Sequence, residues 1–152
     1  MGNLIKLFLA AVLLAYSGLW AETIDADKAK NLALRFVEAK HGRQAGENLR
    51  LRHTARSARD SGRQRIGRMQ DEEQALFYVF NINEDGGGGF VIIAGDNLVR
   101  PVLGFSENGN FDEEKLPPNF EFWMNFLSEQ IVYAQENISV QSEEIREEWN
   151  TL

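Results

Sequence analysis

The first periodic segment of the chain is an amphipathic stretch from residue 29 to residue 40. Its apolar residues recur at intervals of three and four, which places them on one face of a helix; they are Ala29, Leu32, Ala33, Phe36 and Val37. Asp25 and Asp27 precede the stretch, where acidic side chains suit the positive end of a helix dipole. Gly42 follows it and suits a C-terminal stop. The pattern predicts a helix.

Residues 49–55 alternate along the chain with a period of two. On one side lie Leu49, Leu51, His53 and Ala55, and on the other lie two arginines and a threonine. This period predicts a half-buried strand with those four residues on one face. The following Ser57–Gln70 segment is polar, rich in arginine and interrupted by glycine, so we expect an exposed loop that is open to proteolysis.

Three further apolar runs predict the rest of a small antiparallel sheet. Leu76–Ile82 and Phe90–Ala94 are rich in aromatic and β-branched residues, as strands are. Between them, Asp85–Gly89 supplies the residues that tolerate positive φ in a hairpin turn. Pro101 then opens a short strand, Val102–Phe105, where its missing N–H is harmless.

Two helices are predicted in the last third of the chain. The first follows Leu116-Pro117-Pro118, and Asn119 occupies the position expected of its N-cap. Its predicted apolar face comprises Phe122, Phe126, Ile131, Tyr133 and Ala134. Ser142, followed by an acidic run, predicts a short final helix. Together the elements predict an α+β fold, in which a small antiparallel β-sheet carries an N-terminal helix and C-terminal helices packed on it.

The N-terminal residues have the three parts of a secretory signal peptide. Lys6 supplies the positive charge, residues 7–15 the apolar region, and residues 19–21 a cleavage site. The apolar run is shorter than the ~20 residues that a membrane span needs. We therefore expect a signal peptide at 1–21 and one exported domain at 22–152, periplasmic or secreted, without a membrane anchor.

The chain of 152 residues contains no cysteine. This excludes disulfides, thiolate metal sites, a cysteine nucleophile and a lipid anchor on cysteine. An exported domain of this kind has to be stabilised by burial of apolar surface, which its length permits.

Charge divides the chain into a basic and an acidic part. Residues 28–68 hold twelve Lys and Arg against three Asp and Glu, whereas residues 71–152 hold three against seventeen. Such polarity can steer the association of a partner. Binding of nucleic acid is not expected, because no aromatic residues interleave with the arginines near Arg63 and Arg65 and the chain is predicted to be exported.

Several candidate sites lack a residue that their chemistry requires. The glycines at 86–89 are not followed by the Lys-Ser/Thr of a phosphate-binding loop. Residues 81–86 resemble half of a calcium loop, but its twelfth position is Ile92 rather than glutamate. Neither His41 nor His53 has the neighbours of a metal site or a catalytic triad. The sequence therefore predicts a protein that is not an enzyme and holds no metal or cofactor.

A set of short motifs resembles the pro-segment of the streptopain-type cysteine proteases and the Spi-type inhibitors, which are free-standing copies of that pro-segment. Each motif is weak alone, but their order and spacing are specific. They are Tyr78-Val79-Phe80-Asn81, Gly88-Gly89-Phe90-Val91-Ile92, Gly95-Asp96, Leu103-Gly104-Phe105-Ser106, Gly109, Phe111-Asp112 and Glu129-Gln130-Ile131. The resemblance implies the same order of a helix, an antiparallel sheet and a C-terminal helix.

The resemblance also implies an inhibitory loop. In that family an asparagine just before the C-terminal helix enters the substrate cleft of the protease and displaces the loop that bears the catalytic histidine. Aligned backward from Glu129-Gln130-Ile131, this position falls on Asn119, so Asn119 is both a candidate helix cap and a candidate protease contact. The loop is one residue longer here and contains two prolines, so Pro117, Pro118 and Phe120 are included in the predicted site.

Three functions remain open at this point. The first is an exported, non-covalent inhibitor of a streptopain-type cysteine protease, monomeric or in a 1:1 complex with its target. It is favoured because no protease domain follows the module before Leu152. The second is a pro-segment, either from a truncated zymogen or acting as a folding chaperone. The third is an exported adhesion or structural domain that binds a ligand on the Arg50–Arg68 face.

Overall fold

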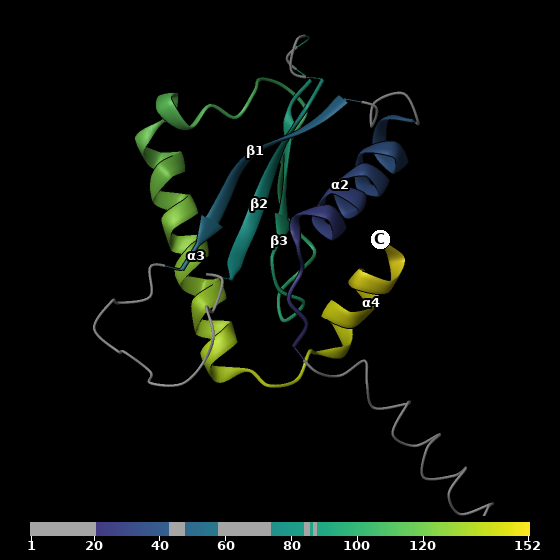
Figure 1. The fold of residues 1–152 in the computed structure, drawn as a ribbon, viewed down its shortest axis with the longest axis vertical. Coiled ribbons are helices and arrows are strands. Elements are labelled where there is room, and N and C mark those ends of the chain that lie inside the picture. Colours follow the sequence, from purple (N-terminus) through teal and green to yellow (C-terminus); the bar gives the residue numbers. More distant parts are fainter. Residues whose placement is uncertain (1–20, 43–47, 58–73, 84–85, 87) are drawn as a thin grey trace, which may run out of the picture.

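The structure is a computed structural model that describes residues 21–42, 48–57, 74–83, 86 and 88–152. It contains a four-stranded antiparallel sheet with helices on both faces (Figure 1), which confirms the predicted α+β fold. The elements are α2 (Ala26–His41), β1 (Leu49–Arg56), β2 (Ala75–Ile82), β3 (Phe90–Ala94), β4 (Val102–Ser106), the 3₁₀ helix η3 (Glu113–Lys115), α3 (Pro118–Asn137) and α4 (Glu143–Thr151).

Two predicted segments near the start of the chain and after β1 fall largely outside the described residues. They are the signal peptide, of which only Ala21 is described, and the Ser57–Gln70 loop, of which only Ser57 is described. Among the helices that are described, none is long and apolar enough to cross a membrane.

The sheet is a meander in which strands that follow one another in sequence are neighbours in space. The strand order is β1-β2-β3-β4, and each pair is antiparallel. The predicted hairpin between β2 and β3 is confirmed, with Asn81 paired to Phe90 next to the turn. Gly89 has φ +96°, and a Cβ there would overlap the carbonyl oxygen of Ser106. Glycine is therefore required at this point because β4 passes so close to the turn.

The core has one layer on each side of the sheet. All eight residues of β2 are buried, so this strand is covered on both faces. Tyr78, Phe80 and Ile82 pack in the layer of α2, and Leu76, Phe77 and Val79 pack in the layer of α3. The predicted face of α2 is confirmed, because four of its five residues are buried and Phe36 is partly buried against the same cluster. The Asp25 side chain caps this helix by accepting from the N–H of Lys28 at 2.7 Å.

The two buried side chains of strand β1 lie on opposite faces of the sheet, so the predicted alternation has to be corrected. A register shift lies between Leu51 and His53, and the extra residue, Arg52, is a β-bulge. Because one inserted residue reverses the faces, Leu49 joins the α2 layer and Ala55 joins the α3 layer. Leu51 remains 43% exposed. The prediction that Leu49, Leu51, His53 and Ala55 share one face was wrong.

Helix α3 also differs from its predicted orientation. It is buried through Met124, Ile131 and Ala134, so two of the five predicted residues are correct. The other three are on the opposite side, where Phe122, Phe126 and Tyr133 are 72%, 50% and 62% exposed. Sequence periodicity chose the wrong side because apolar residues occur on nearly every face of this helix.

The turn at residues 96–100 fastens both ends of the described chain. The side-chain oxygen of Asn97 accepts from the N–H of Glu22 at 2.8 Å, and its carbonyl accepts from Gln141 at 2.7 Å. Trp149 of α4 donates to the carbonyl of Val99 at 2.8 Å. The cap predicted for α4 is confirmed, since the hydroxyl oxygen of Ser142 accepts from the N–H of Ile145 at 3.3 Å. Helix α4 is thereby held beside α2 (Figure 1).

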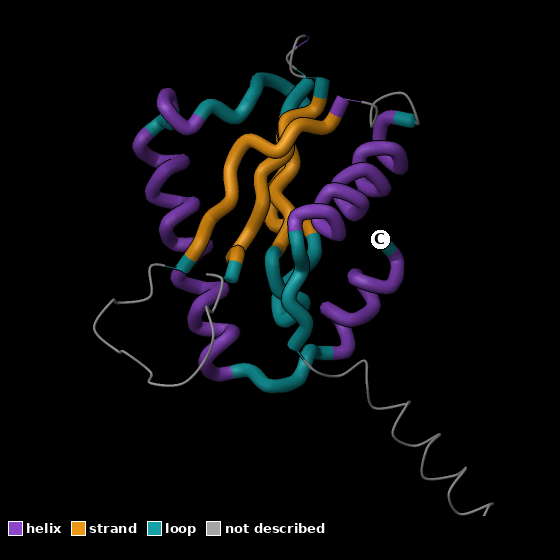
Figure 2. The backbone as a smooth tube through the Cα atoms, viewed as in Figure 1, coloured by secondary structure: helices purple, strands orange, loops and turns teal. Residues whose placement is uncertain are grey.

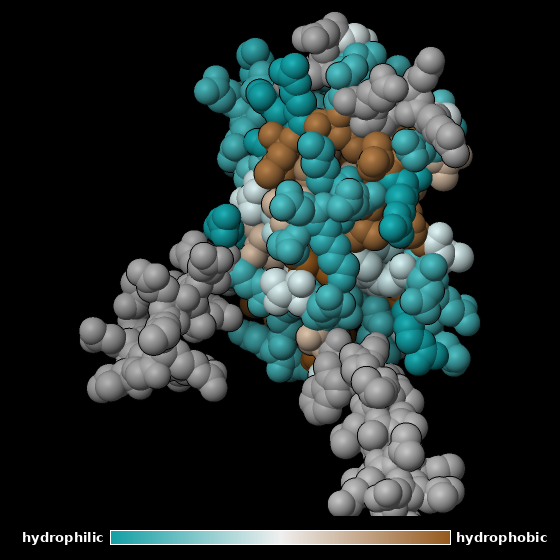
Figure 3. All heavy atoms as spheres, turned by 45° about the vertical axis from the view of Figure 1, so that its right-hand side comes forward, coloured by the Kyte–Doolittle hydropathy of each residue, from teal (hydrophilic) through white to brown (hydrophobic). Residues whose placement is uncertain are grey.

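The side that carries α2 and α4 keeps some apolar surface. Figure 3 turns this side forward and shows a hydrophobic patch in its upper half, among hydrophilic surface. Partly buried hydrophobic residues pack against the core layer under α2; they are Ala26, Leu34, Phe36, Val102, Phe105, Trp149 and Leu152. We assign this layer a structural role, since the helices and β4 already share it.

Tyr78 links the core to the segment before α2, and ionisation of its phenol lowers the stability of the fold at alkaline pH. Its hydroxyl donates to the carbonyl of Ile24 at 2.9 Å. Burial raises the pKa of Tyr78 above its ordinary value of 10.0, and the nearby Asp25 carboxylate raises it further. Folding therefore favours the protonated phenol. Its contribution is complete below the unfolded pKa and is lost as pH rises through the higher folded pKa.

We expect Tyr78→Phe to cost about 1 kcal/mol in the free energy of unfolding at neutral pH, because one buried hydrogen bond is lost. We also expect the variant to lose less stability than the unmodified protein above pH 10. Urea denaturation at neutral pH and above pH 10 measures both effects. Equal losses of stability in the two proteins would contradict the role of this phenol.

Candidate functional site

The segment after β4 crosses one end of the sheet to reach α3 (Figure 2). It passes through η3 and ends at Pro117-Pro118-Asn119-Phe120, which is named here the Pro117–Phe120 corner. Pro117, Pro118 and Asn119 are exposed, and Phe120 is half-buried. The four predicted site residues therefore lie together at the start of α3, with three of them exposed to solvent and Phe120 turned partly into the protein.

The cap of α3 corrects one predicted role of Asn119. The N-cap is Pro117, with extended backbone angles of φ −61° and ψ 140°, and Pro118 is the first helical residue. The Pro117 carbonyl accepts from the N–H groups of Phe120 and Glu121 at 2.9 and 3.0 Å. No side chain caps the first turn. Proline is favoured at the first helical position, so the N-cap lies two residues earlier than predicted and Asn119 is not the cap.

An apolar groove of about 620 Å³ lies under the corner. Its apolar walls come from Phe90, Phe111, Leu116 and Phe120, and Pro117 and Asn119 also line it. Pro118 does not. The rest of the lining comes from Asn110, Asp112 and Lys115.

The rings beneath the corner form a continuous aromatic cluster. Phe120 contacts Phe90 and Phe111 edge to face, with ring centroids 5.7 and 6.4 Å apart. It stacks on Trp123 at 5.5 Å. Gly104 of β4 leaves room for that indole, since a Cβ there would stand 3.1 Å from the nearest ring carbon. Phe120 therefore supports the corner from within, and Pro117 to Asn119 form its exposed part.

Asn81 fixes the start of the segment that leads to the corner. Its amide group is fully buried; it accepts from the N–H of Phe111 at 2.8 Å and donates to the Phe111 carbonyl at 3.1 Å. These are two complementary bonds between one side chain and one backbone unit. Asn81 belongs to one of the motifs that carry the family resemblance, but no role for its side chain was predicted. A signal existed, because Asn81 is the one polar side chain other than tyrosine in the apolar run 75–82.

Acidic side chains hold the next turn of the segment. The Asp112 carboxylate accepts from Lys115 at 3.1 Å and from the N–H of Glu114 at 3.2 Å. The hydrogen bond from Lys115 lowers the pKa of Asp112, and the bond from the Glu114 backbone adds to this. His53 of β1 lies with Nδ1 3.2 Å from a carboxylate oxygen of Glu113. His53 is a partly buried residue of β1.

The model of one protein family matches the range that builds this site. It is the family described as Spi protease inhibitor, and it matches residues 21–131. The chain belongs to the Spi protease inhibitor family. Helix α2, the whole sheet, the groove and the Pro117–Phe120 corner all lie inside the family's matched range, whereas α4 lies beyond it.

Two curated relatives are similar to part of this family member. The thiol protease/hemagglutinin PrtT of Porphyromonas gingivalis is 30% identical over 77 residues, which are 51% of this chain and 9% of PrtT. Streptopain of Streptococcus pyogenes is 33% identical over 85 residues, which are 56% of this chain and 19% of streptopain. The chain thus spans less than a fifth of either relative. No solved structure gives a significant match.

These findings confirm the resemblance drawn from the sequence. They support the role of a protease inhibitor or a propeptide for this module.

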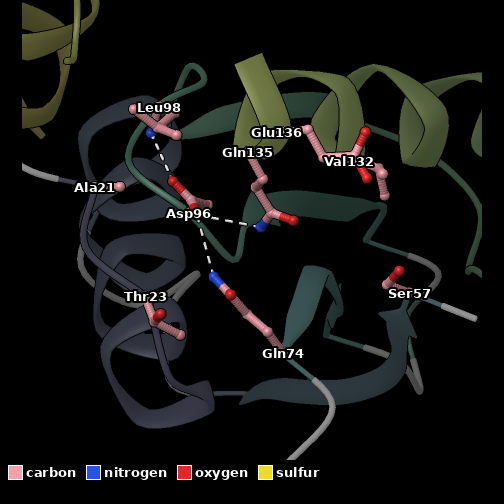
Figure 4. Close-up of a pocket in the computed structure, with 9 residues that line it drawn as sticks. All are labelled: Ala21, Thr23, Ser57, Gln74, Asp96, Leu98, Val132, Gln135 and Glu136. Carbon is pink, nitrogen blue, oxygen red and sulfur yellow. Dashed lines mark hydrogen bonds between the residues drawn. The ribbon is translucent and has the colours of Figure 1, made fainter. Parts of the chain in front are cut away.

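A second cavity of about 340 Å³ lies at the other end of the sheet, around Asp96 (Figure 4). Asp96 is 3% exposed, and one carboxylate oxygen accepts from Gln74 and Gln135, each at 3.1 Å. The other oxygen accepts from the N–H of Leu98 at 2.9 Å. Asp96 thus joins the start of β2, helix α3 and the turn after β3. We assign it a structural role, since its carboxylate is already occupied by three donors.

The predicted ligand face of a structural or adhesion domain, Arg50–Arg68, falls mostly outside the described residues. Its described part is β1 with Ser57. Searched across the residues that the structure describes, no group of three or more histidine, cysteine or acidic side chains is arranged to hold a metal ion.

Proposed function

We propose that this chain inhibits a streptopain-type cysteine protease by placing the Pro117–Phe120 corner in the substrate cleft. Binding is non-covalent, and the corner displaces the loop that bears the catalytic histidine, so that cysteine and histidine do not pair. The observation that carries the proposal is the exposed segment Pro117–Asn119 on a partly buried aromatic cluster, in a member of the Spi protease inhibitor family.

The corner is suited to act as a preorganised wedge. Two consecutive prolines fix the backbone at the start of α3 and lower the conformational entropy that binding would remove. Asn119 carries its amide at the exposed tip, and Phe120 fastens the tip to the sheet through Phe90 and Phe111. Charge on the two parts of the chain orients the approach of the protease.

The inhibitor is proposed to be one exported domain, residues 22–152, after removal of the signal peptide at 1–21. It acts as a monomer in a 1:1 complex with the protease. The direct test adds the purified protein at micromolar concentration to mature streptopain and measures hydrolysis of a peptide substrate, with heat-unfolded protein as the control. We expect loss of protease activity. Full activity in the presence of the folded protein would contradict the proposal.

We expect Asn119→Ala to weaken inhibition by about tenfold or more, equivalent to about 1.4 kcal/mol. The free energy of unfolding should change by less than about 0.5 kcal/mol, because the residue is exposed and does not cap α3. The inhibition constant and urea denaturation measure the two effects. Asn125→Ala, at another exposed position of α3, is the matched control. Equal inhibition by the two variants would contradict the assignment of Asn119.

A second candidate is a pro-segment that assists the folding of a protease. It is favoured by the fact that both relatives are named as proteases and are much longer than the matched region. In this case the protein should raise the yield of active streptopain refolded from denaturant. A yield that is unchanged by the protein, together with inhibition of the mature enzyme, would favour the inhibitor.

A further inference from the structure

Helix α3 carries an aromatic stripe that the fold does not use. The stripe consists of Phe122, Phe126 and Tyr133, which are 72%, 50% and 62% exposed. The helix is fastened to the sheet by its other side, through Met124, Ile131 and Ala134. Three large, solvated aromatic side chains in a row on one helix mark an interaction surface better than single exposed hydrophobic residues do.

The aromatic stripe begins at the inhibitory corner. At 100° per residue, Asn119, Phe122, Phe126 and Tyr133 lie within an arc of about 60° on the helix surface. At 1.5 Å per residue, they extend over about 21 Å along the axis. All four are exposed. A partner that covers Asn119 and continues along the helix therefore meets the three aromatic rings.

The charge of helix α3 distinguishes between two possible partners of the aromatic stripe, a second copy of the chain and a different protein. Helix α3 contains Glu121, Glu129 and Glu136 and no lysine or arginine. At 100° per residue, Glu129 and Glu136 border one edge of the stripe, so two copies of the chain that paired antiparallel through this face would bring these carboxylates together, which is unfavourable. A partner with an apolar strip edged by basic side chains would complement both the rings and the carboxylates.

We infer that the aromatic stripe of α3 is a second contact surface for the inhibited protease. It docks on an apolar strip edged by basic side chains beside the substrate cleft, while the Pro117–Phe120 corner occupies the cleft. This inference rests on the proposed function. Its consequence is that affinity and occlusion come from different residues of one helix, with the aromatic rings supplying affinity and Asn119 blocking the cleft.

The test is the double variant Phe122→Ser/Phe126→Ser, with streptopain as the protease. We expect the inhibition constant to rise by about 100-fold, because aromatic residues in the centre of an interface contribute most to its affinity. The melting temperature should stay within about 2 °C of that of the unmodified protein, because both side chains are solvated. Leu51→Ser is the matched control, since Leu51 is a similarly exposed apolar residue on β1; its inhibition should be unchanged.

Tyr133→Ser provides a second variant at an exposed position, to be used if the double variant melts early. It should weaken inhibition by about tenfold. Unchanged inhibition by both stripe variants, while Asn119→Ala remains a poor inhibitor, would overturn the docking surface and leave the proposed function intact. Failure of the unmodified protein to inhibit would instead contradict the proposed function, and the docking surface with it.

Sedimentation velocity tests the alternative that the stripe binds a second copy of the chain. We expect the unmodified protein to sediment as a monomer at about 100 μM, because the carboxylates of Glu129 and Glu136 border the stripe. A dimer that dissociates in the Phe122→Ser/Phe126→Ser variant would assign the stripe to self-association and overturn the inference.

Discussion

Replacing Asn81 with leucine is expected to lower the free energy of unfolding by about 3 kcal/mol and the melting temperature by roughly 10 °C. The variant leaves the N–H and the carbonyl of Phe111 without their partner, and Phe111 is 2% exposed. Each buried backbone group without a partner costs roughly 1–3 kcal/mol. Urea denaturation measures the loss.

The same exchange should release the segment that leads to the corner. Amide hydrogen exchange across residues 107–117 is therefore expected to accelerate more than exchange in α2. Inhibition of the protease should weaken even under conditions in which the variant is folded, because the wedge is no longer preorganised. Asn125→Leu makes the same replacement at an exposed position of α3 and should change neither property.

Asn81→Asp tests the donor separately from the acceptor. The carboxylate retains an oxygen for the Phe111 N–H, but it has no hydrogen to donate to the Phe111 carbonyl. Burial raises the pKa of a carboxyl group, so folding favours its protonated form and the variant should recover stability as pH falls. A free energy of unfolding that is unaffected by Asn81→Leu would show that the segment is held by other contacts.

Replacing Asp96 with alanine is expected to cost about 3 kcal/mol, the second large effect. Three donors lose a charged acceptor, namely the side-chain amides of Gln74 and Gln135 and the N–H of Leu98. The penalty is moderated by the adjoining cavity of about 340 Å³, because water can enter it and accept from the two amides. The expected result is a lower denaturant midpoint with an unchanged slope.

Asp96→Asn separates charge from geometry. One oxygen remains as an acceptor, and either glutamine can turn its own carbonyl toward the new amide, so the loss should be about half of that in Asp96→Ala. A double-mutant cycle between Asp96→Ala and Gln135→Ala gives the share that belongs to α3. A coupling energy near zero would show that Asp96 does not fasten this helix to the turn.

The sequence was sufficient to predict most of the elements, because their signals are local. The face of α2 followed from its apolar spacing, and the hairpin followed from glycines between two apolar runs. Strand β1 was predicted as a strand, but the faces on which its side chains lie were predicted wrongly. The bulge at Arg52 depends on how β1 pairs with β2, and no property of residues 49–55 alone announces it.

The site was predicted as a stretch of sequence and not as a geometry. Pro117–Phe120 lie together as expected, but the start of α3 depends on competition between two positions for the cap. Pro118 at the first helical position decided it. The side of α3 that faces the sheet carries Met124 and Ile131, which pack with Phe77 and Val79 of β2. This packing depends on the sheet, so the apolar pattern of the helix alone does not predict it. The role of Asn81 could not be predicted either, because it depends on two hydrogen bonds with the backbone of Phe111, which is distant in the sequence.

The shared attachment of both chain ends to the turn at 96–100 has a practical consequence for surface immobilisation. The described segment before α2 lies at the end opposite the Pro117–Phe120 corner, and the last residues of α4 lie across the sheet from α3 (Figure 1). A linker to a sensor chip or a bead, attached at either end, would therefore leave the corner and the aromatic stripe facing solution. Captured in this way, the protein should serve as an oriented affinity reagent for the proposed target, a streptopain-type protease.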